Sequence, residues 1–360
     1  MLISLLYRKY RPQTFDQVVG QEHVVQTLKG ALLTGRVGHA YLFTGPRGTG
    51  KTTLARVFAK ALNCTNRKEN NFEPCDKCSA CIDVGMNRSL DLIEIDAASQ
   101  TGVDNIRELT DSAMVAAPSG RYKIFIIDEV HMLSKSAFNA LLKTLEEPPS
   151  HVVFILATTE VHKVLPTVLS RVQRFDFRKI TTKEIVGKLK EISRAEKIDI
   201  DDQGLLAMAM ASDGALRDAE VFLTKMQASV SGKISADDVY STLGLIPAKY
   251  HIEFLNYLVS NDKPAAINFI QKISNAGVDI ENFTKDFLEY LRKILIHKIS
   301  PATLASFGET PDQESARLGM QIENARLVRI ITLFSSARNE IKNSPISQLP
   351  LELALMELLG

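Results

Sequence analysis

The feature that most constrains the fold is a glycine-rich stretch, GPRGTGKT, at residues 45–52. It fits the pattern G-x-x-x-x-G-K-T, follows the apolar run AYLF and opens the helix-compatible segment TTLARVFAKAL. A strand that leads through such a loop into a helix is typical of folds whose backbone N–H groups surround a phosphate. The stretch therefore predicts a nucleotide-binding loop made of Gly45, Pro46, Arg47, Gly48, Thr49, Gly50, Lys51 and Thr52.

Short apolar runs alternate with helical patterns in the first half of the chain. This alternation predicts a parallel sheet with helices on both faces. After residue 180 the strand signals end, and Thr181 followed by Glu184 predicts a helix with a capping box. The expected strands lie at residues 40–45, 91–96, 123–128 and 152–159.

These patterns predict three domains. The first is an α/β nucleotide-binding domain at residues 1–179, the second a small helical lid at 180–243, and the third an all-helical domain at 244–360. At 360 residues with 45% hydrophobic content, the chain is long enough to bury more than one core.

The apolar run KIFIID ends in the carboxylate Asp128 and is followed by Glu129, and both should lie beside the glycine-rich loop. Asp128 is expected to hold Mg²⁺ through water, together with the Thr52 hydroxyl. Glu129 is expected to polarise an attacking water as general base, while Lys51 neutralises the β and γ oxygens of ATP. The arrangement predicts ATP hydrolysis with ATP and Mg²⁺ as ligands.

The letters DEVH at residues 128–131 also resemble a box found in many helicases. Those motors need two tandem cores, whereas this chain has one glycine-rich loop and a helical remainder. The alternative is an ATPase that hydrolyses at a subunit interface, to which the neighbouring subunit supplies a cation. Arg171, in VLSRVQRF, follows the expected strand 152–159 closely enough to be that cation.

The four cysteines of the chain form one cluster with the spacing C-x10-C-x2-C-x2-C. Four thiolates suit a closed tetrahedral Zn²⁺ site. Free reduced cysteines and an iron–sulfur cluster fit the same spacing, although no other feature indicates redox chemistry. We expect a zinc module at about residues 63–90, held by Cys64, Cys75, Cys78 and Cys81.

Charge and hydropathy restrict the classes of protein further. Lys and Arg number 43 against 42 Asp and Glu, so any contact with DNA must be local. No apolar run approaches the length of a membrane span, and the N-terminal MLISLLYRKYR carries its charges after its short apolar stretch, unlike a signal peptide. These features predict a cytoplasmic protein with no membrane partner.

The order of motifs resembles that of one family. RPQTFDQVVGQ, GPRGTGKT, the cysteine cluster, EIDAASQTGVDNIREL, IIDEVHMLS, FNALLKTLEEPP, LATTE, LSR and GALRDA occur in this order. The series resembles the gamma/tau subunits of bacterial DNA polymerase III, the AAA+ ATPases of the sliding-clamp loader.

The resemblance implies an ATPase in a heteropentamer with delta-type and delta-prime-type subunits and copies of itself. ATP binding would drive clamp opening and binding of primer–template DNA, and hydrolysis would release the clamp on DNA. The helical third domain would be an oligomerisation collar, and no polymerase active site is expected. The alternative is an AAA+ remodelling or regulatory ATPase that acts on DNA or protein without a clamp.

The resemblance also implies roles for single residues beyond the loop. Thr158 would be a polar sensor near the γ-phosphate, Arg171 an arginine finger for a neighbouring subunit, and Arg217 a second sensor that closes the lid. The family commonly has Cys after the finger, whereas this chain has Val172. Four residues would surround adenine and ribose: Tyr7, Arg11, Pro12 and Val19. Three would contact the DNA backbone: Arg107, Lys143 and Thr159.

Overall fold

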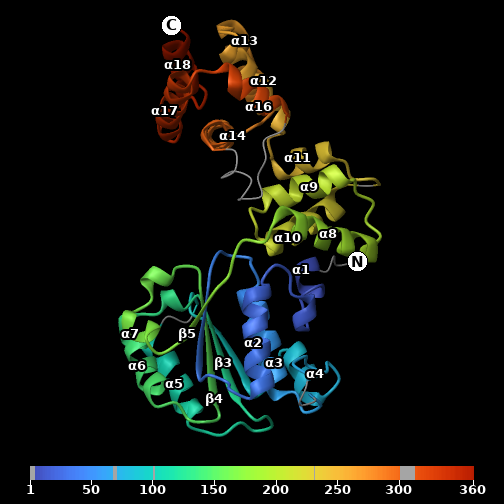
Figure 1. Cartoon of the computed structure of the whole chain (residues 1–360), viewed down its shortest axis with the longest axis vertical. Coiled ribbons are helices and arrows are strands. Elements are labelled where there is room, and N and C mark those ends of the chain that lie inside the picture. Colours follow the sequence, from blue (N-terminus) through green and yellow to red (C-terminus); the bar gives the residue numbers. More distant parts are fainter. Residues whose placement is uncertain (1–4, 68–70, 100–101, 231, 301–312) are drawn as a thin grey trace. The chain divides into compact units, whose positions relative to one another are not determined.

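The computed structural model describes residues 5–67, 71–99, 102–230, 232–300 and 313–360. The chain forms two compact units, Met1–Ser235 and Ala236–Gly360 (Figure 1). The finer division into three domains stays a prediction. Residues 68–70 of the predicted zinc module and residues 100–101 of the motif EIDAASQTGVDNIREL lie outside the described residues.

The first unit is built on a five-stranded parallel sheet with the strand order β2-β3-β4-β1-β5. The four predicted strands are confirmed to within one residue at each end. A fifth strand at the edge was not predicted, because only Phe175 among its four residues is buried. The strands are β1 (Ala40–Thr44), β2 (Leu92–Asp96), β3 (Lys123–Asp128), β4 (Val152–Thr158) and β5 (Gln173–Asp176).

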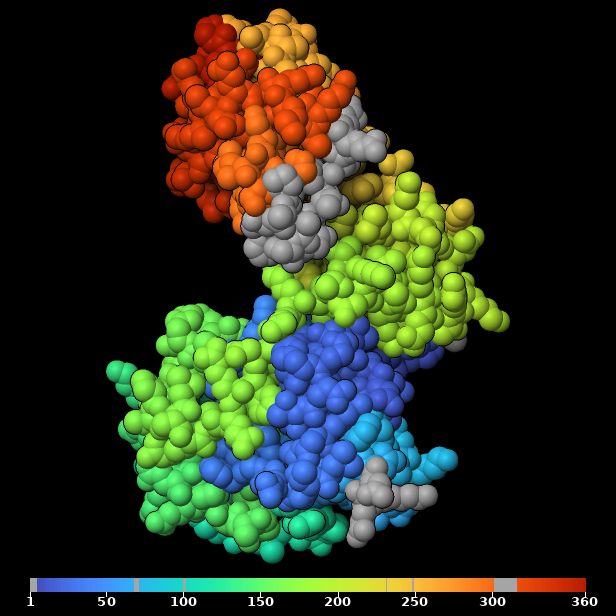
Figure 2. All heavy atoms as spheres, in the orientation of Figure 1, coloured from blue at the N-terminus to red at the C-terminus, as the bar shows by residue number. Residues whose placement is uncertain are grey.

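Helices cover both faces of this sheet, as predicted. One face packs against α2 and α3, with Leu28, Leu54 and Phe58 buried on it. The other packs against α5 and α6, with Ile106 and Phe138 buried on it. Figure 1 shows the two layers, and in Figure 2 α2 and its neighbours, in blue, form the middle of the visible surface of the unit, beside green segments. The elements around the sheet are α1 (Leu6–Lys9), η1 (Phe15–Gln17), α2 (Glu22–Thr34), α3 (Lys51–Asn63), α4 (Ser79–Gly85), α5 (Val103–Ala113), η2 (Val130–Met132), α6 (Lys135–Glu146), η3 (Val161–Lys163) and α7 (Pro166–Leu169).

Among the described residues, three helices follow the sheet within the first unit. The predicted capping box is present: Thr181 Oγ1 accepts from the Glu184 N–H at 3.3 Å, and the Glu184 carboxylate accepts from the Thr181 N–H at 2.9 Å. The apolar positions Ile185, Leu189 and Ile192 are buried on one face. These helices are α8 (Thr182–Glu196), α9 (Asp202–Ala211) and α10 (Leu216–Ser229).

The second unit is helical throughout its described residues. Its core is rich in aromatic rings, among which Phe254, Phe283, Phe287 and Phe334 are fully buried. None of the described helices in either unit combines the length and the apolar character needed to cross a membrane. The helices are α11 (Ala236–Leu243), α12 (Ala248–Val259), α13 (Lys263–Asn275), α14 (Ile280–Ile299), α16 (Gln313–Gln321), α17 (Asn324–Ile341) and α18 (Leu349–Leu359).

The topology brings three chemically important chain segments together at the carboxyl ends of the central strands. Strands β3, β4 and β1 are neighbours and parallel, so their carboxyl ends meet. The register pairs Thr44 with Thr158, and Asp128 ends the adjacent strand β3. In open parallel sheets ligands bind at the carboxyl ends of the strands, so the candidate site should lie there.

Candidate nucleotide site and cysteine cluster

The glycine-rich loop between β1 and α3 depends on two close backbone contacts. Gly45 has a φ of 143°, and a Cβ there would lie 2.4 Å from the Phe177 carbonyl oxygen. Gly48 has a φ of 77°, and a Cβ there would lie 2.7 Å from the Ala215 Cβ. Only glycine fits both positions without strain. The loop is thereby packed against the segment after β5 and the residue that precedes α10.

Lys51 opens α3 and points back into the loop. Its Nζ donates to the carbonyl oxygens of Gly45 and Pro46, each at 2.8 Å, and the residue is only 6% exposed. Burial lowers the pKa of Lys51, an effect that the nearby carboxylates of Glu129 and Asp128 oppose. The ammonium therefore lies among the backbone groups that the motif uses to hold a phosphate.

Thr52 and Asp128 meet at the carboxyl end of β3. The Thr52 hydroxyl donates to Asp128 Oδ2 at 2.7 Å, and the backbone N–H of Glu129 donates to Asp128 Oδ1 at 3.0 Å. Mg²⁺ prefers oxygen ligands and usually keeps several waters when one or two carboxylates bind it. A hydroxyl and a carboxylate beside a phosphate loop fit that ion.

Glu129 is held by groups from the end of β4 and from η2. Its backbone adopts a left-handed conformation, with a φ of 48°. Its Oε2 accepts from the Thr159 hydroxyl at 3.1 Å and from the Thr159 N–H at 3.3 Å, and it lies 3.3 Å from His131 Nδ1. The buried Thr158 hydroxyl is 2.9 Å from the same His131 nitrogen, while Glu160 is 3.1 Å from Nε2. His131 therefore connects the predicted sensor to the predicted base.

One cavity of about 680 Å³ in the first unit gathers most of the predicted nucleotide residues. Arg217, in the first turn of α10, lines it with its guanidinium 4.7 Å from the centre of the Tyr7 ring. Arg11 lines it as well, donating from Nε to the Thr53 hydroxyl at 3.3 Å. Burial is the main reason that the pKa of Arg11 is lowered. The predicted residues that line the cavity are Tyr7, Arg11, Pro12, Val19, Arg47, Gly48, Thr49, Gly50, Lys51, Thr52, Asp128, Glu129 and Arg217.

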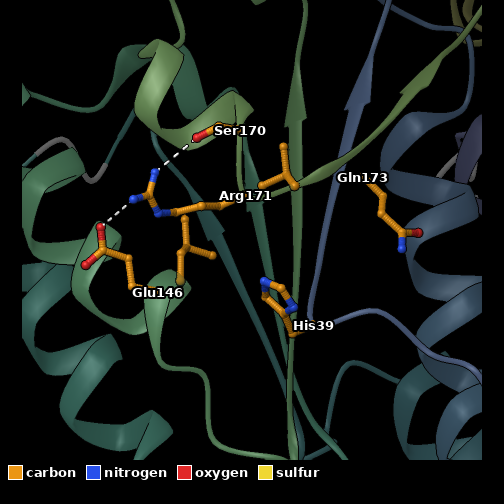
Figure 3. A pocket seen from close by; sticks show the side chains of 7 residues that line it. His39, Glu146, Ser170, Arg171 and Gln173 are labelled. Atoms are coloured by element: carbon orange, nitrogen blue, oxygen red, sulfur yellow. Dashed lines mark hydrogen bonds and ion pairs between the residues drawn. The ribbon is translucent and has the colours of Figure 1, made fainter.

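Arg171 lines a different pocket, at residues 170–173 after α7 (Figure 3). Its guanidinium donates to Glu146 Oε1 at 2.7 Å, to the Thr167 carbonyl oxygen at 2.7 Å and to Ser170 Oγ at 3.0 Å. His39 and Gln173 lie across the same pocket. Arg171 is therefore not part of the nucleotide cavity of its own chain.

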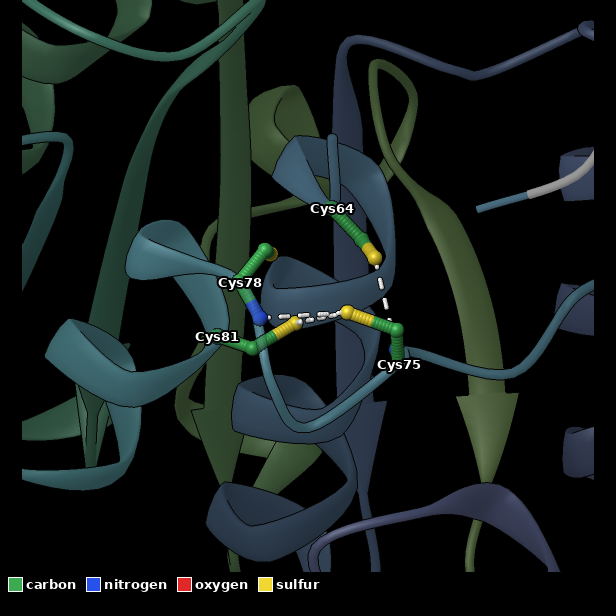
Figure 4. A group of neighbouring side chains, drawn as sticks. All are labelled: Cys64, Cys75, Cys78 and Cys81. Atoms are coloured by element: carbon green, nitrogen blue, oxygen red, sulfur yellow. Dashed lines mark hydrogen bonds between the residues drawn. The ribbon is translucent and has the colours of Figure 1, made fainter. Parts of the chain in front are cut away.

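The four cysteines converge just after α3 (Figure 4). All four sulfur atoms lie within 4.8 Å of one another, and Cys75 Sγ is 4.0 Å from Cys81 Sγ. A Zn–S bond of about 2.3 Å gives S···S separations of about 3.8 Å in a tetrahedron. Backbone N–H groups donate to Cys64 Sγ and Cys75 Sγ, each at 3.3 Å. Burial raises the pKa values of the Cys64 and Cys81 thiols, so a bound cation would be needed to hold these two as thiolates. Burial also acts to raise the pKa of Cys78, but hydrogen bonds from Thr65 and Cys81 outweigh it and lower that pKa to about 6. The cluster fits one tetrahedral Zn²⁺.

Comparisons with known proteins assign the chain to a family. A model of the DNA polymerase III delta subunit matches residues 20–181, and a model of domain III of the DNA polymerase III gamma and tau subunits matches residues 234–360. The DNA polymerase III gamma subunit of Buchnera aphidicola subsp. Acyrthosiphon pisum is 36% identical over 100% of this chain and 99% of its own length. The chain belongs to the gamma/tau subunit family of DNA polymerase III.

Longer members of the gamma/tau family match as well. The tau subunit of Bacillus subtilis is 41% identical over 99% of this chain and 63% of its own length. The tau subunit of Escherichia coli is 37% identical over 100% of this chain and 56% of its own length. The chain thus spans less than two thirds of either tau subunit.

Solved structures with a similar arrangement include the RuvB Holliday junction branch migration motor of Thermotoga maritima. It has a TM-score of 0.48 and 21% identity, covering 69% of this chain and 79% of that chain. The clamp loader delta protein of Bacillus subtilis has a TM-score of 0.40 and 15% identity, covering 93% and 99%. The family and the observed sheet confirm the predicted P-loop AAA+ core with a helical C-terminal region.

The three residues of this gamma/tau protein that were predicted to contact DNA are not tested by the structure, so these contacts stay predictions. Arg107 is exposed on α5, where it pairs with Asp104 at 3.2 Å, and Lys143 is exposed on α6. Thr159 bonds to Glu129, so its hydroxyl already has a role in the nucleotide site.

Two residues of the site were missed by sequence reasoning. Gln21 is buried, accepts from the Arg178 N–H at 3.1 Å and donates to the Arg178 carbonyl oxygen at 2.7 Å, which ties the start of α2 to the segment after β5. His131 was passed over although it follows Glu129 by two positions. Both stand inside the quoted motifs VVGQ and DEVH, but only the fold shows what they contact.

Proposed function

We propose that this chain is the ATPase motor subunit of a bacterial sliding-clamp loader within DNA polymerase III. ATP binding would drive opening of the clamp and binding of primer–template DNA, and hydrolysis would release the clamp on the DNA. Membership of the gamma/tau family and an AAA+ core support ATPase activity in general. The steps that involve the clamp and DNA are the proposal.

The observation that carries the proposal is the convergence of Lys51, the Thr52–Asp128 pair and Glu129 on one cavity. Lys51 would meet the β and γ oxygens, and Thr52 with Asp128 would hold Mg²⁺, which neutralises charge on the phosphates when bound. Glu129 would orient the attacking water. Its bonds to Thr159 fix the carboxylate near the ends of β3 and β4, where that water would lie.

The proposed hydrolysis needs a second subunit. Arg217 would act within its own chain, because it lines the same cavity as the P-loop. Arg171 lines another pocket and has a partly exposed side chain, so we infer that it serves the site of a neighbouring subunit. An arginine that stabilises developing charge on the γ-phosphate acts only in the transition state. Assembly would therefore control the chemical step more than ATP binding.

We propose that the four-cysteine cluster binds one structural Zn²⁺. Four sulfur ligands leave no open position for catalysis. Of the three interpretations that the spacing allows, zinc is favoured by the mutual distances of the sulfur atoms, all within 4.8 Å of one another. The metal would stabilise the connection between α3 and β2, which carries little apolar content of its own.

The proposed partners are delta-type and delta-prime-type subunits and further copies of this chain in a heteropentamer, together with the ring clamp and primer–template DNA. The second unit would form the oligomerisation collar. Arg107, Lys143 and Thr159 remain the proposed DNA contacts. The cytoplasmic location predicted from the sequence is part of the same proposal.

Capture by a ring clamp tests this function. The chain, reconstituted with its loader subunits, should be retained on an immobilised clamp with Mg²⁺ and a non-hydrolysable ATP analogue, and released with ADP. The Lys51→Ala variant should not be retained. If the complex binds ATP but is not retained on the clamp with any nucleotide, the chain is instead a remodelling or regulatory AAA+ ATPase.

A further inference from the structure

A buried carboxylate without a hydrogen-bond partner lines the nucleotide cavity. Glu220 lies on α10, three residues after Arg217, and is only 6% exposed. Within the described part of the chain no group donates a hydrogen bond to its side chain. Lys188 of α8 is the cation whose charge acts on it, but the Lys188 ammonium is bonded to Glu191 at 2.9 Å. An unpaired carboxylate in such a position is costly.

The place of Glu220 in the cavity follows from the course of α10. The residue before this helix, Ala215, contacts the P-loop at Gly48. Glu220 lies five residues further on, about 7.5 Å along the helix axis at 1.5 Å per residue. It shares a face of α10 with Leu216, four residues earlier, and both line the cavity. Glu220 is therefore removed from the phosphate loop, on the side of Leu216.

Apolar side chains line the same cavity beside polar ones such as Tyr7 and Arg11. Val18 and Val19 line it from the N-terminal segment, and Ile180 lines it from the segment before α8. A nucleoside triphosphate whose phosphates occupy the P-loop extends its base away from that loop. The flat apolar faces of a purine suit these side chains, and its polar edge would meet Glu220.

We propose that Glu220 recognises the base of the nucleotide by accepting a hydrogen bond from the exocyclic amino group of adenine. The inference rests on the proposed binding of ATP at this site. Adenine carries an amino donor at the position where guanine carries a carbonyl acceptor. An ionised carboxylate facing that position pairs with the adenine amino group, whereas the guanine carbonyl would face it as a second acceptor. Glu220 is in this sense a specificity-determining residue.

The electrostatics of the site agree with this role. Burial raises the pKa of the Glu220 carboxyl to about 7, and the charge of Lys188 opposes the rise. Around neutral pH the carboxyl is therefore only partly ionised. Both protonation states keep an oxygen that accepts from an amino group, and the protonated state can also donate to the adjacent ring nitrogen of adenine. The donor supplied by the base would offset the cost of burial.

Three nucleotides separate base recognition from phosphate binding. ATP, purine riboside triphosphate, which lacks the amino group, and GTP are titrated with Mg²⁺ into the full-length chain. The parent should bind ATP about 10-fold to 100-fold more tightly than purine riboside triphosphate, the range expected for one hydrogen bond to a charged group. The Glu220→Leu variant should bind both with the same affinity. The Glu220→Gln variant keeps an acceptor oxygen and should retain part of the preference.

The comparison is a ratio within each variant, so partial misfolding, which lowers binding of every nucleotide alike, does not change it. Glu191→Gln is the matched control, because it removes the other carboxylate beside Lys188 and is 64% exposed; it should keep the parent ratio. Equal affinity of the parent for ATP and purine riboside triphosphate, an unchanged ratio in Glu220→Leu, or a preference for GTP would each overturn the inference while leaving the ATPase proposal intact. Failure to bind any of the three nucleotides would overturn both.

Discussion

The Arg171 guanidinium is bonded to Glu146 Oε1 at 2.7 Å, so the proposed arginine finger is held by a carboxylate of its own chain (Figure 3). The Arg171 side chain is partly exposed, at 33%, and that of Glu146 is exposed, at 50%. Exposed ion pairs contribute about 0.2–1 kcal/mol. An ion pair of this strength breaks easily. The γ-phosphate of ATP bound in a neighbouring subunit would be a stronger partner for Arg171.

Because the ion pair with Glu146 is weak, substitution of Arg171 should change the rate of ATP hydrolysis far more than substitution of Glu146. In the assembled complex Arg171→Ala should retain ATP binding and lose hydrolysis, since comparable fingers in GTPases accelerate the reaction by about 10³ to 10⁵. Glu146→Gln should change the hydrolysis rate by no more than about fivefold. Arg174→Ala, a nearby exposed arginine that pairs with Asp176, serves as the control. Steady-state hydrolysis rates of the three variant complexes are measured at saturating ATP and compared with the rate of the parent complex. An Arg171→Ala complex that hydrolyses at the parent rate would remove the finger assignment.

Lys51 and Glu129 should differ in which step they affect. Lys51→Ala removes the charge within the P-loop and should weaken ATP binding and abolish hydrolysis. Glu129→Gln keeps the size of the side chain and should leave binding largely intact while stopping turnover. Equilibrium titration with ATP, followed by single-turnover hydrolysis, separates the two steps. If both variants lost binding to the same extent, Glu129 would not be the general base.

The cysteine cluster predicts one zinc per chain. Structural zinc typically stabilises a small module by about 10 kcal/mol or more at neutral pH. A strong chelator should therefore raise amide hydrogen exchange in α4 and around Cys75, and added Zn²⁺ should restore protection. Elemental analysis of the native, fully reduced protein gives the stoichiometry. Iron in place of zinc would indicate the iron–sulfur alternative, and absence of any metal would leave four free cysteines.

The second unit should lose stability in mild acid because of His251. Its ring stacks on Phe283 and Phe287, and its buried Nε2 has no hydrogen-bond partner in the described structure. Burial lowers the pKa of His251 to about 4, below its ordinary value of about 6.5. The unfolded chain therefore binds a proton first as pH falls, so the stabilisation is complete above pH 6.5 and is lost toward pH 4, by about 3 kcal/mol at most.

Calorimetric unfolding of the full chain between pH 4 and 7.5 measures this dependence. His251→Phe keeps an aromatic ring and removes the titrating nitrogen, so the transition of the second unit should become less sensitive to pH. His297→Gln, a half-buried histidine near the end of α14, is the control and should keep the parent dependence. An unchanged pH dependence in His251→Phe would show that other groups control acid unfolding.

The sequence was sufficient for features that rest on local pattern. The apolar runs of β1 to β4, the glycine-rich loop and the capping box at Thr181 each depend on residues close together in the chain. Strand β5 was not predicted because it lies at the sheet edge, where three of its four side chains, Gln173, Arg174 and Asp176, are exposed. Residues 173–176 form a strand because they pair with β1, and hydropathy does not reveal that pairing.

Relationships between distant residues were beyond sequence reasoning. His131 contacts Thr158 only because β3 and β4 are neighbours. Arg171 and Glu146 are 25 positions apart and meet because α6 and α7 pack together. A glutamate near the start of a helix is ordinarily solvated, so nothing in GALRDAE indicated that Glu220 is buried in the nucleotide cavity.

The rate of ATP hydrolysis by the reconstituted complex, with and without ring clamp and primed DNA, tests the proposed function most directly. A clamp-loader motor should hydrolyse slowly alone and faster when both are present, because both are needed to complete the cycle. Glu129→Gln in the same complex should abolish the stimulated rate. A rate that is unaffected by clamp and primed DNA, in a complex that binds ATP, would contradict the account.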